Sequence, residues 1–435
     1  PRLMSSYEIP LNSIYPYIPT ISSRNLKIIN RITIILASLS LIGSFMLFAS
    51  GIYYLFCELN KFMFQGQISP IFITVIGVLL FIMSIILLIY YKRLKFSLKF
   101  NQFFQIFCGF SIVIIFLFLV QFTGNWGPIM MPVKDGARIV IYTFIAKSVS
   151  IKVVNNGQTT VYSDYGRCHS FYVPFRKFDL YYEKGFKSYD LSTLNSFIFI
   201  SDNHNQETKY ILQKFSPDLI VSGGDNANDG FFQDFFAFFK DYQTQIPFLT
   251  AIGNHDRRLN EQIFGFDYKN YYSQVDGVGF YFVNVMSRAL MGLVDRSEVD
   301  VAVKFVELNV NPTDVARIMV VHAPMYPYSN ADELQYQQQF EALLDKYSFQ
   351  FVLSGHQHFF SYFKRNGVKI IVSSSSGGRK DLQDKNTLKS DVQASNYFQK
   401  YFDDIYTFSV FQRVGNNFKV TVYNLETGQA LYEIL

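Results

Sequence analysis

The chain is poor in cysteine: only Cys57, Cys108 and Cys168 occur among its 435 residues. Three thiols allow at most one disulfide bond, so a disulfide-stapled framework is excluded.

Charge of one sign is also too scarce in most of the chain to mark a nucleic-acid-binding surface. Residues 1–123 contain nine basic and two acidic side chains, whereas the remaining residues contain 30 basic and 32 acidic ones. The net charge of +5 therefore comes from the first 123 residues, and we expect no nucleic-acid partner.

Three stretches within these 123 residues have no charged side chain at all: residues 32–56, 69–91 and 100–122. Each exceeds the roughly 20 residues that a helix needs to cross a hydrocarbon core of about 30 Å. Core helices of a large domain would also be apolar, but three such runs separated by short loops favour transmembrane helices. We therefore predict a membrane region over residues 1–123, with the lipid bilayer as a partner.

Basic residues orient this predicted membrane region. Arg24, Lys27 and Arg31 precede the first span and four basic residues lie in the loop 92–99, whereas the first loop carries only Lys61. By the positive-inside rule, the amino terminus and the second loop lie on the same side. The sequence thus predicts a multi-pass membrane protein whose remaining residues, 124–435, lie on the opposite face.

The chain also lacks an N-glycosylation sequence, because its one near match, Asn311-Pro312-Thr313, has proline in the middle. A large domain facing the secretory lumen usually carries one or two. The absence favours a compartment without N-glycosylation, such as the mitochondrial inner membrane, or a prokaryotic-type membrane.

Residues 124–193 alternate like short strands, at 138–145, 149–154, 159–162 and 171–173. Turn signals separate them: Asn155-Asn156-Gly157 is a hairpin signal, and Asp164–Gly166 is a second break. We predict a small antiparallel β-sandwich-like domain here. The competing interpretation is that these strands extend the sheet of the domain that follows.

Five short segments in residues 194–435 contain five of the six histidines of the chain. Each follows a short apolar run that reads as a buried strand, so the polar residues lie just past strand carboxyl ends, where open α/β sheets bind ligands. The segments are Asp202-Asn203-His204, Gly224-Asp225-Asn226, Gly253-Asn254-His255-Asp256, Val321-His322-Ala323-Pro324 and Gly355-His356-Gln357-His358.

The residue types in these segments suit a pair of divalent metal ions. Carboxylate, amide oxygen and imidazole are ligands of Mn, Zn, Fe and Mg, and the segments contain no cysteine, which argues against a thiolate-rich structural zinc site. Asp225 is the natural bridge between two ions about 3.5–4 Å apart, because it lies between an acidic segment and the later amide and imidazole ligands.

With all five segments present in order, residues 194–435 resemble the calcineurin-like metallophosphoesterase superfamily, whose pattern is D-x-H, G-D, G-N-H-[D/E], a lone His and G-H-x-H. The resemblance implies an α/β metallophosphatase fold, a two-sheet sandwich flanked by helices, preceded here by the three transmembrane helices and the small β domain. In membrane or secreted members a fibronectin-like domain often occupies the place of residues 124–193. Helical patterns at 206–215, 231–242, 298–308 and 333–347, and a terminal hairpin of 407–411 with 418–423, agree with this architecture.

The resemblance also implies roles for individual residues. One ion would be held by Asp202, His204, Asp225 and His358, and the second by Asp225, Asn254, His322 and His356. His255, held by Asp256, would be the catalytic histidine aimed at the leaving-group oxygen. Arg257 and Arg258 are weaker candidates for binding substrate phosphate, since consecutive loop arginines are more often simply solvated.

Two departures narrow the subclass. Asn228 stands where purple acid phosphatases carry an iron-binding tyrosine, and the chain lacks the G-D-x-V-D-R-G motif of protein Ser/Thr phosphatases. We therefore predict a membrane metallophosphoesterase that hydrolyses a phosphomonoester or phosphodiester with a hydroxide bridging two metal ions. The alternatives are a non-catalytic subunit of a larger membrane complex and a receptor for a phosphorylated lipid. The sequence does not choose the substrate or the metal.

Overall fold

The computed structural model describes residues 126–434, except residue 184 and the segments 205–214, 228–245, 257–268, 287–292, 327–330 and 377–394. The described residues belong to one compact unit that includes residues 121–435. Its elements are β1 (Trp126–Val133), β2 (Gly136–Asn155), β3 (Gln158–Val173), β4 (Lys177–Tyr182), β5 (Gly185–Asp190), β6 (Ser196–Ile200), β7 (Leu219–Ser222), β8 (Phe248–Thr250), β9 (Tyr271–Val275), β10 (Val278–Val283), α7 (Arg296–Asn309), β11 (Ala316–Val321), α8 (Ala331–Tyr347), β12 (Phe351–Ser354), β13 (Phe360–Arg365), β14 (Val368–Val372), β15 (Phe398–Phe402), β16 (Thr407–Val414), β17 (Asn417–Asn424) and β18 (Ala430–Ile434).

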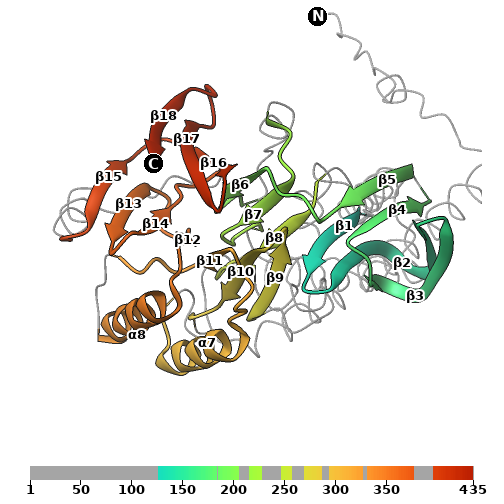
Figure 1. Ribbon diagram of the computed structural model, residues 1–435, viewed down its shortest axis with the longest axis horizontal. Coiled ribbons are helices and arrows are strands. Elements are labelled where there is room, and N and C mark those ends of the chain that lie inside the picture. Colours follow the sequence, from blue (N-terminus) through green and yellow to red (C-terminus); the bar gives the residue numbers. More distant parts are fainter. Residues whose placement is uncertain are drawn as a thin grey trace, which may run out of the picture. The chain divides into compact units, whose positions relative to one another are not determined.

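Two mixed sheets form the centre of this unit (Figure 1). The seven-stranded sheet has the order β15-β13-β14-β12-β11-β10-β9, and the six-stranded sheet has the order β18-β17-β16-β6-β7-β8. Strands β10, β11, β12 and β14 run parallel in the first sheet, as do β6, β7 and β8 in the second. The two-sheet part of the predicted fold class is therefore confirmed.

The seven-stranded sheet is buried on both faces, which explains the continuous apolar runs of its strands. Phe280 and Phe282 of β10 lie in the hydrophobic cluster that includes residues of β6 and β7. The intervening Tyr281 and Val283 lie in a second cluster, with buried residues of α7 and α8. Successive side chains of a strand point to opposite faces, so one face packs on the other sheet and one on the two helices.

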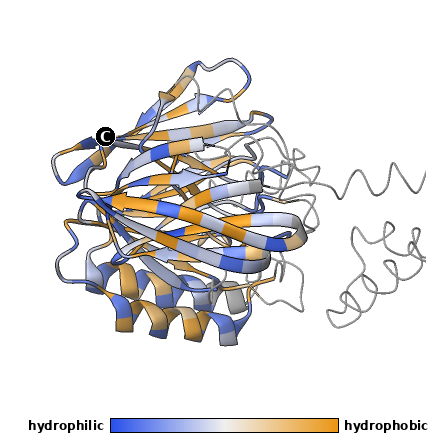
Figure 2. Cartoon of the chain, turned by 90° about the vertical axis from the view of Figure 1, so that its right-hand side faces the viewer, coloured by the Kyte–Doolittle hydropathy of each residue, from blue (hydrophilic) through white to orange (hydrophobic). Residues whose placement is uncertain are grey.

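Both described helices begin and end close to their predicted bounds. In α7, Asp295 is the N-cap and accepts a hydrogen bond from the backbone N–H of Ser297, and Val299, Ala302 and Val306 form the buried stripe. Figure 2 shows apolar and polar residues alternating along the two helices. The helices predicted at 206–215 and 231–242 lie almost wholly outside the described residues.

The strands before residue 191 form a separate five-stranded antiparallel sheet, with β1, β2, β4 and β5 in order and β3 paired with β2. The predicted turn at Asn155-Asn156-Gly157 is confirmed: Asn156 and Gly157 have φ of 49° and 78° and join β2 to β3. The predicted break at Asp164–Gly166 is wrong, because β3 runs through it.

The β2–β3 pairing is irregular beside these residues, because its register shifts between Tyr142 and Lys147. The small sheet is also packed against the larger ones, since Ile129 and Met131 of β1 belong to the cluster between the two central sheets. The domain boundary at residue 193 and the fibronectin likeness stay predictions.

The predicted fold class and localisation need one correction. The fold class included three transmembrane helices, and the localisation was a multi-pass membrane protein with the catalytic domain on one face. The described residues are mostly β-strand with two helices, and no helix among them is long and apolar enough to cross a membrane. The proposed spans at 32–56, 69–91 and 100–122 lie outside the described residues, so the structure gives them no support. The three transmembrane helices of the fold class and the membrane localisation are therefore withdrawn.

Candidate metal centre

The five predicted segments meet at one edge of the two central sheets. Asp202, Asp225 and Asn254 follow β6, β7 and β8, the neighbouring parallel strands of the six-stranded sheet. His322 and His356 follow β11 and β12, which are parallel neighbours in the seven-stranded sheet. Parallel strands bring their carboxyl ends to the same edge, which explains how residues more than 150 positions apart become neighbours.

Asp202, His204 and His358 form the first cluster. Their candidate ligand atoms all lie within 4.8 Å of one another. The two Nε2 atoms of His204 and His358 are 3.3 Å apart, and Nε2 of His358 is 3.4 Å from a carboxylate oxygen of Asp202. Two imidazoles and a carboxylate converging in this way form a donor set for a divalent ion.

Asp225, His322 and His356 form the second cluster, within the same 4.8 Å limit. Nε2 of His322 lies 3.2 Å from Asp225 Oδ2. The side-chain oxygen of Asn254 lies 3.0 Å from both His322 Nε2 and His356 Nδ1. The amide oxygen thus completes a set of one carboxylate, one amide and two imidazoles.

Asp225 joins the two clusters, because its Oδ2 atom also lies 3.9 Å from Nε2 of His204. Asp202 and Asp225 are both buried, and each has a carboxylate oxygen within 4.0 Å of His322 Nε2, so their negative charges require compensating positive charge. The described residues therefore form two adjacent candidate sites for divalent metal ions.

The backbone at these positions is strained in a consistent way. Five of the seven candidate ligands have φ values in the left-handed region, which costs non-glycine residues roughly 1–2 kcal/mol each. They are Asp202 (53°), His204 (46°), Asp225 (52°), His356 (73°) and His358 (53°). Strain of this kind collected at one place points to a functional site.

Hydrogen bonds from the surrounding loops orient the ligand side chains. Nδ1 of His322 lies 2.8 Å from the carbonyl oxygen of Gly223, which directs its Nε2 atom toward the cluster. The backbone N–H of His255 donates to Asp225 Oδ1 at 2.7 Å, and that of His356 donates to the carboxylate of Asp202 at 3.0 Å. The ligand loops thus hold one another's side chains.

Burial and neighbouring charges shift the pKa values of the side chains in the two clusters. Burial disfavours the charge of Asp202, but the hydrogen bond from His358 and the charge of His322 lower its pKa to about 2. Burial disfavours a charged His322 as well, yet the adjacent Asp225 carboxylate raises the pKa of His322 to about 10. Burial, together with the neighbouring His322, lowers the pKa of His356 to about 4.

The predicted catalytic pair, His255 and Asp256, lies beside the two clusters. The ring of His255 lies edge-on to that of His204, with centroids 4.8 Å apart, so it borders the first cluster. The Asp256 carboxylate accepts hydrogen bonds from backbone N–H groups of the ligand loops. That Asp256 holds His255 stays a prediction, and Arg257 and Arg258 lie outside the described residues.

Sequence reasoning missed a run of four buried serines, Ser373–Ser376, after β14. Ser375 Oγ donates to the carbonyl oxygen of Asp202 at 2.7 Å, and the N–H of Ser376 donates to that of Ser201 at 2.8 Å. Asn203 donates to the carbonyl oxygen of Ser376 at 3.2 Å. The run therefore ties β14 to the Asp202 loop. Its signal in the sequence was four small polar residues following an apolar strand.

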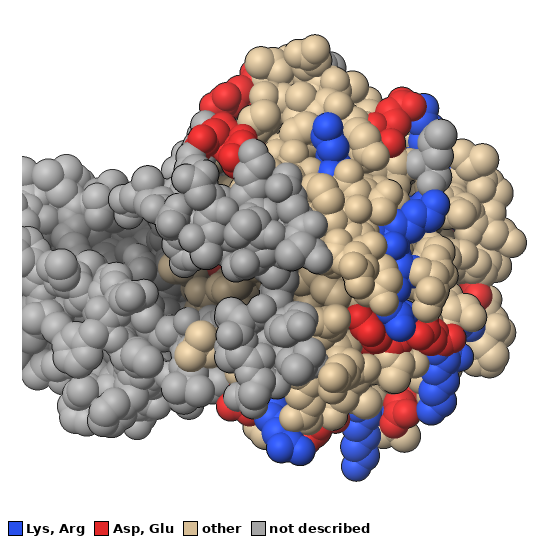
Figure 3. All heavy atoms as spheres, turned by 90° about the vertical axis from the view of Figure 1, so that its left-hand side faces the viewer, with Lys and Arg blue, Asp and Glu red and all other residues tan. Residues whose placement is uncertain are grey.

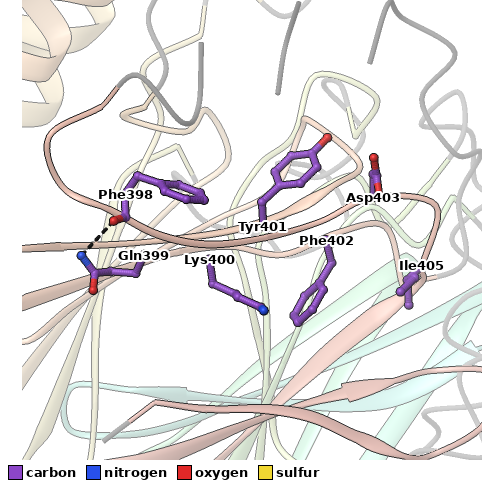
Figure 4. A pocket seen from close by; sticks show the side chains of 7 residues that line it. All are labelled: Phe398, Gln399, Lys400, Tyr401, Phe402, Asp403 and Ile405. Carbon is purple, nitrogen blue, oxygen red and sulfur yellow. Dashed lines mark hydrogen bonds between the residues drawn. The ribbon is translucent and has the colours of Figure 1, made fainter. Parts of the chain in front are cut away.

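A pocket of about 370 Å³ lies along β15 and the residues after it, lined by residues 398–403 and Ile405. Figure 4 shows Tyr401 and Phe402 on opposite sides of the strand, and Gln399 donating to the carbonyl of Phe398. None of the candidate ligands lines this pocket. On the face shown in Figure 3, basic and acidic side chains are interspersed with uncharged ones.

The two-sheet fold, with paired carboxylate and imidazole clusters at the strand ends, defines a metallophosphoesterase-type domain. A model of the calcineurin-like phosphoesterase family matches residues 196–360. This part of the chain belongs to that family.

Comparison with other proteins adds only distant likenesses, and no curated protein matches the chain. GAP50, the anchor in the inner membrane complex of Plasmodium, is 17% identical, with a TM-score of 0.41 over 55% of this chain and 87% of that one. Vps29 from Entamoeba histolytica, complexed with zinc, is 9% identical, with a TM-score of 0.32 over 55% and 98%. A putative 5′-nucleotidase from Staphylococcus aureus is 10% identical, with a TM-score of 0.32 over 53% and 52%. At such values these likenesses say nothing about what the chain binds.

Proposed function

We propose that the protein is a hydrolase of phosphate esters that uses two divalent metal ions. The observation that carries this proposal is the convergence of the two donor clusters on Asp225. Seven ligand side chains from five loops reach one place, and the backbone accepts strain at five of them. A domain with only a structural role would not need five ligand residues with strained backbones in one place.

The ions would be held by Asp202, His204, Asp225 and His358 on one side, and by Asp225, Asn254, His322 and His356 on the other. When bound, they supply the positive charge that activates a water near neutral pH and stabilises phosphoryl oxygens. The metal identity stays open among Mn, Zn, Fe and Mg.

The protein's own residues add positioning and proton transfer. Asp225 contacts both clusters and sets their separation. His255 borders the first cluster without belonging to either donor set, and this proposal assigns it no metal-binding role. In its protonated form His255 donates to the departing ester oxygen, which raises the rate by general acid catalysis.

The test is turnover by the full chain, purified and supplied with Mn²⁺, Zn²⁺ or Mg²⁺. p-Nitrophenyl phosphate reports monoesterase activity and bis-p-nitrophenyl phosphate reports diesterase activity. We expect hydrolysis of at least one ester that chelation abolishes and that added metal restores. Binding of two ions without hydrolysis of either ester would contradict the proposal and favour a non-catalytic metal-binding subunit.

The matched control is Asp314→Asn. Asp314 is another buried carboxylate, and it accepts hydrogen bonds from Tyr272, Gln274 and Tyr281. It belongs to neither candidate metal cluster. We expect this variant to lose stability but to keep metal-dependent turnover per folded molecule.

A further inference from the structure

Asp256 has a set of hydrogen bonds that a residue serving only to orient a histidine would not need. Its side chain is fully buried. Its Oδ2 atom accepts from the backbone N–H groups of Asp225 at 2.8 Å and Gly253 at 3.0 Å, and its Oδ1 atom accepts from those of Asn226 at 2.9 Å and Ala227 at 3.3 Å. One carboxylate therefore holds four main-chain donors from two ligand loops.

These two loops leave the sheet at the point where its ladder stops. The last paired residues of β7 and β8 are Ser222 and Thr250, and the N–H of Ala251 makes one further bond to the carbonyl oxygen of Ser222, at 2.9 Å. Beyond this bond, the hydrogen bonds to the Asp256 carboxylate connect the two chain segments instead of direct bonds between their backbones. The carboxylate connects the loop that carries Asp225 to the loop that carries Asn254.

The left-handed conformation of Asp225 explains how three successive N–H groups reach one anion. A residue with positive φ turns the N–H groups around it toward a common concavity, which is an anion-binding arrangement of the backbone. Asp225 has φ of 52°. Its strained backbone and the Asp256 carboxylate therefore depend on each other.

The two loops also have almost no room to move relative to each other. A Cβ atom added at Gly253 would lie 2.1 Å from Oδ1 of Asp225 and 2.4 Å from its backbone nitrogen. Only glycine permits this approach. A change in the position of either loop therefore displaces Asp225, the side chain common to both donor clusters.

We propose that Asp256 is a positioning residue for the metal pair, which sets the backbone of the Asp225 and Asn254 loops and acts independently of His255. The proposal rests on the metal-dependent function proposed above and deepens it. It assigns Asp256 to metal binding, whereas the family resemblance assigns it to the orientation of the catalytic histidine.

The test compares Asp256→Asn with the wild-type full chain by titrating Mn²⁺ into metal-free protein in a calorimeter. An amide at this place presents an NH₂ group to main-chain donors and cannot accept all four bonds. We expect the affinity for at least one Mn²⁺ to fall tenfold or more, and the electron paramagnetic resonance signal of a coupled Mn²⁺ pair to disappear. Unchanged affinities and an unchanged paired signal would overturn the proposal.

Two further variants separate positioning from general stability and from His255. Asp314→Asn removes a buried carboxylate elsewhere, and we expect it to lower the urea midpoint without changing Mn²⁺ affinity. His255→Ala is expected to leave Mn²⁺ affinity within about twofold, and in the double variant with Asp256→Asn the losses in turnover at saturating Mn²⁺ should multiply. A double variant no worse than His255→Ala would show that Asp256 acts through the histidine.

If Asp256→Asn does not fold, Asp256→Glu keeps the charge and displaces it by one methylene group, and the same loss of Mn²⁺ affinity is expected. Because calorimetry needs no turnover, this result is independent of the proposed function. A wild-type chain that binds two Mn²⁺ ions but hydrolyses no ester would refute the function and leave the role of Asp256 standing.

Discussion

Asp225→Asn is the substitution from which we expect the largest change for the smallest alteration in shape. The amide keeps one oxygen in place and removes the negative charge. Asp225 lies within 3.2 Å of His322 Nε2 and 3.9 Å of His204 Nε2, so it contributes to both donor clusters. Its N–H remains available to Asp256, so the loop conformation is not the target of this variant.

The magnitude follows from the loss of one buried negative charge that would face the bound cations. Removing one partner of a buried pair typically costs about 3–5 kcal/mol. Because the amide oxygen still binds weakly, we take the lower figure, which corresponds to roughly a hundredfold loss in metal affinity.

Calorimetric titration of Mn²⁺ gives that affinity directly, and hydrolysis of p-nitrophenyl phosphate and its diester gives turnover. We expect affinity at both sites to fall and turnover to drop at least a hundredfold. Asp314→Asn is the matched control. Two Mn²⁺ affinities within threefold of the wild type, with turnover retained, would refute the assignment of Asp225 as the shared ligand.

Four further results are expected. Burial opposes the charge of His322, but the Asp225 carboxylate raises the pKa of His322 to about 10. Mn²⁺ must therefore displace a proton from His322, and the affinity for Mn²⁺ should rise about tenfold per pH unit between pH about 7 and 10. Calorimetry in buffers of different ionisation enthalpy measures the released proton, and its absence would contradict this prediction. The same raised pKa stabilises the metal-free fold fully below pH about 6.5, and this stability is lost as pH rises through about 10, where the urea midpoint should fall. Gly253→Ala should lower both stability and Mn²⁺ affinity, because its Cβ would lie 2.4 Å from the nitrogen of Asp225, whereas Gly166→Ala, with its nearest neighbour at 3.9 Å, should change Mn²⁺ affinity little. Ser375→Ala leaves the buried carbonyl of Asp202 without its 2.7 Å hydrogen bond, at a cost of about 1–3 kcal/mol; a Mn²⁺ affinity and urea midpoint equal to wild type would show that this bond contributes nothing.

The sequence indicated where the candidate ligands lie because each of the five segments directly follows an apolar run, and the family resemblance implied which residues hold which ion. A buried strand such as β7, whose four residues are all buried, leaves a recognisable pattern, and the first polar residues after it must lie at the sheet edge. The same logic placed α7 and α8, whose apolar stripes recur with helical spacing. Local patterns of this kind require no knowledge of distant contacts.

Other features depend on contacts that no local pattern contains. The family resemblance implied that Asp256 holds His255, but it gave no sign of the four N–H groups that Asp256 binds, three of which lie about 30 residues away. The serine run after β14 contacts the Asp202 loop because the ends of β14 and β6, strands of different sheets, lie side by side. Asp164–Gly166 has the composition of a turn, but pairing with β2 keeps it in a strand.

The strained backbone links these observations. Five ligands in the left-handed region together cost on the order of 5–10 kcal/mol, comparable to the whole stability of a typical domain. Such a cost persists only where surrounding bonds hold the conformation in place. At Asp225 those bonds come from Asp256, and at Asp202 they come from the serine run and the N–H of His356. Asp256, which the family resemblance assigned to His255, and the serine run, which the sequence analysis missed, thus hold candidate ligands in a backbone conformation that these ligands would not adopt alone.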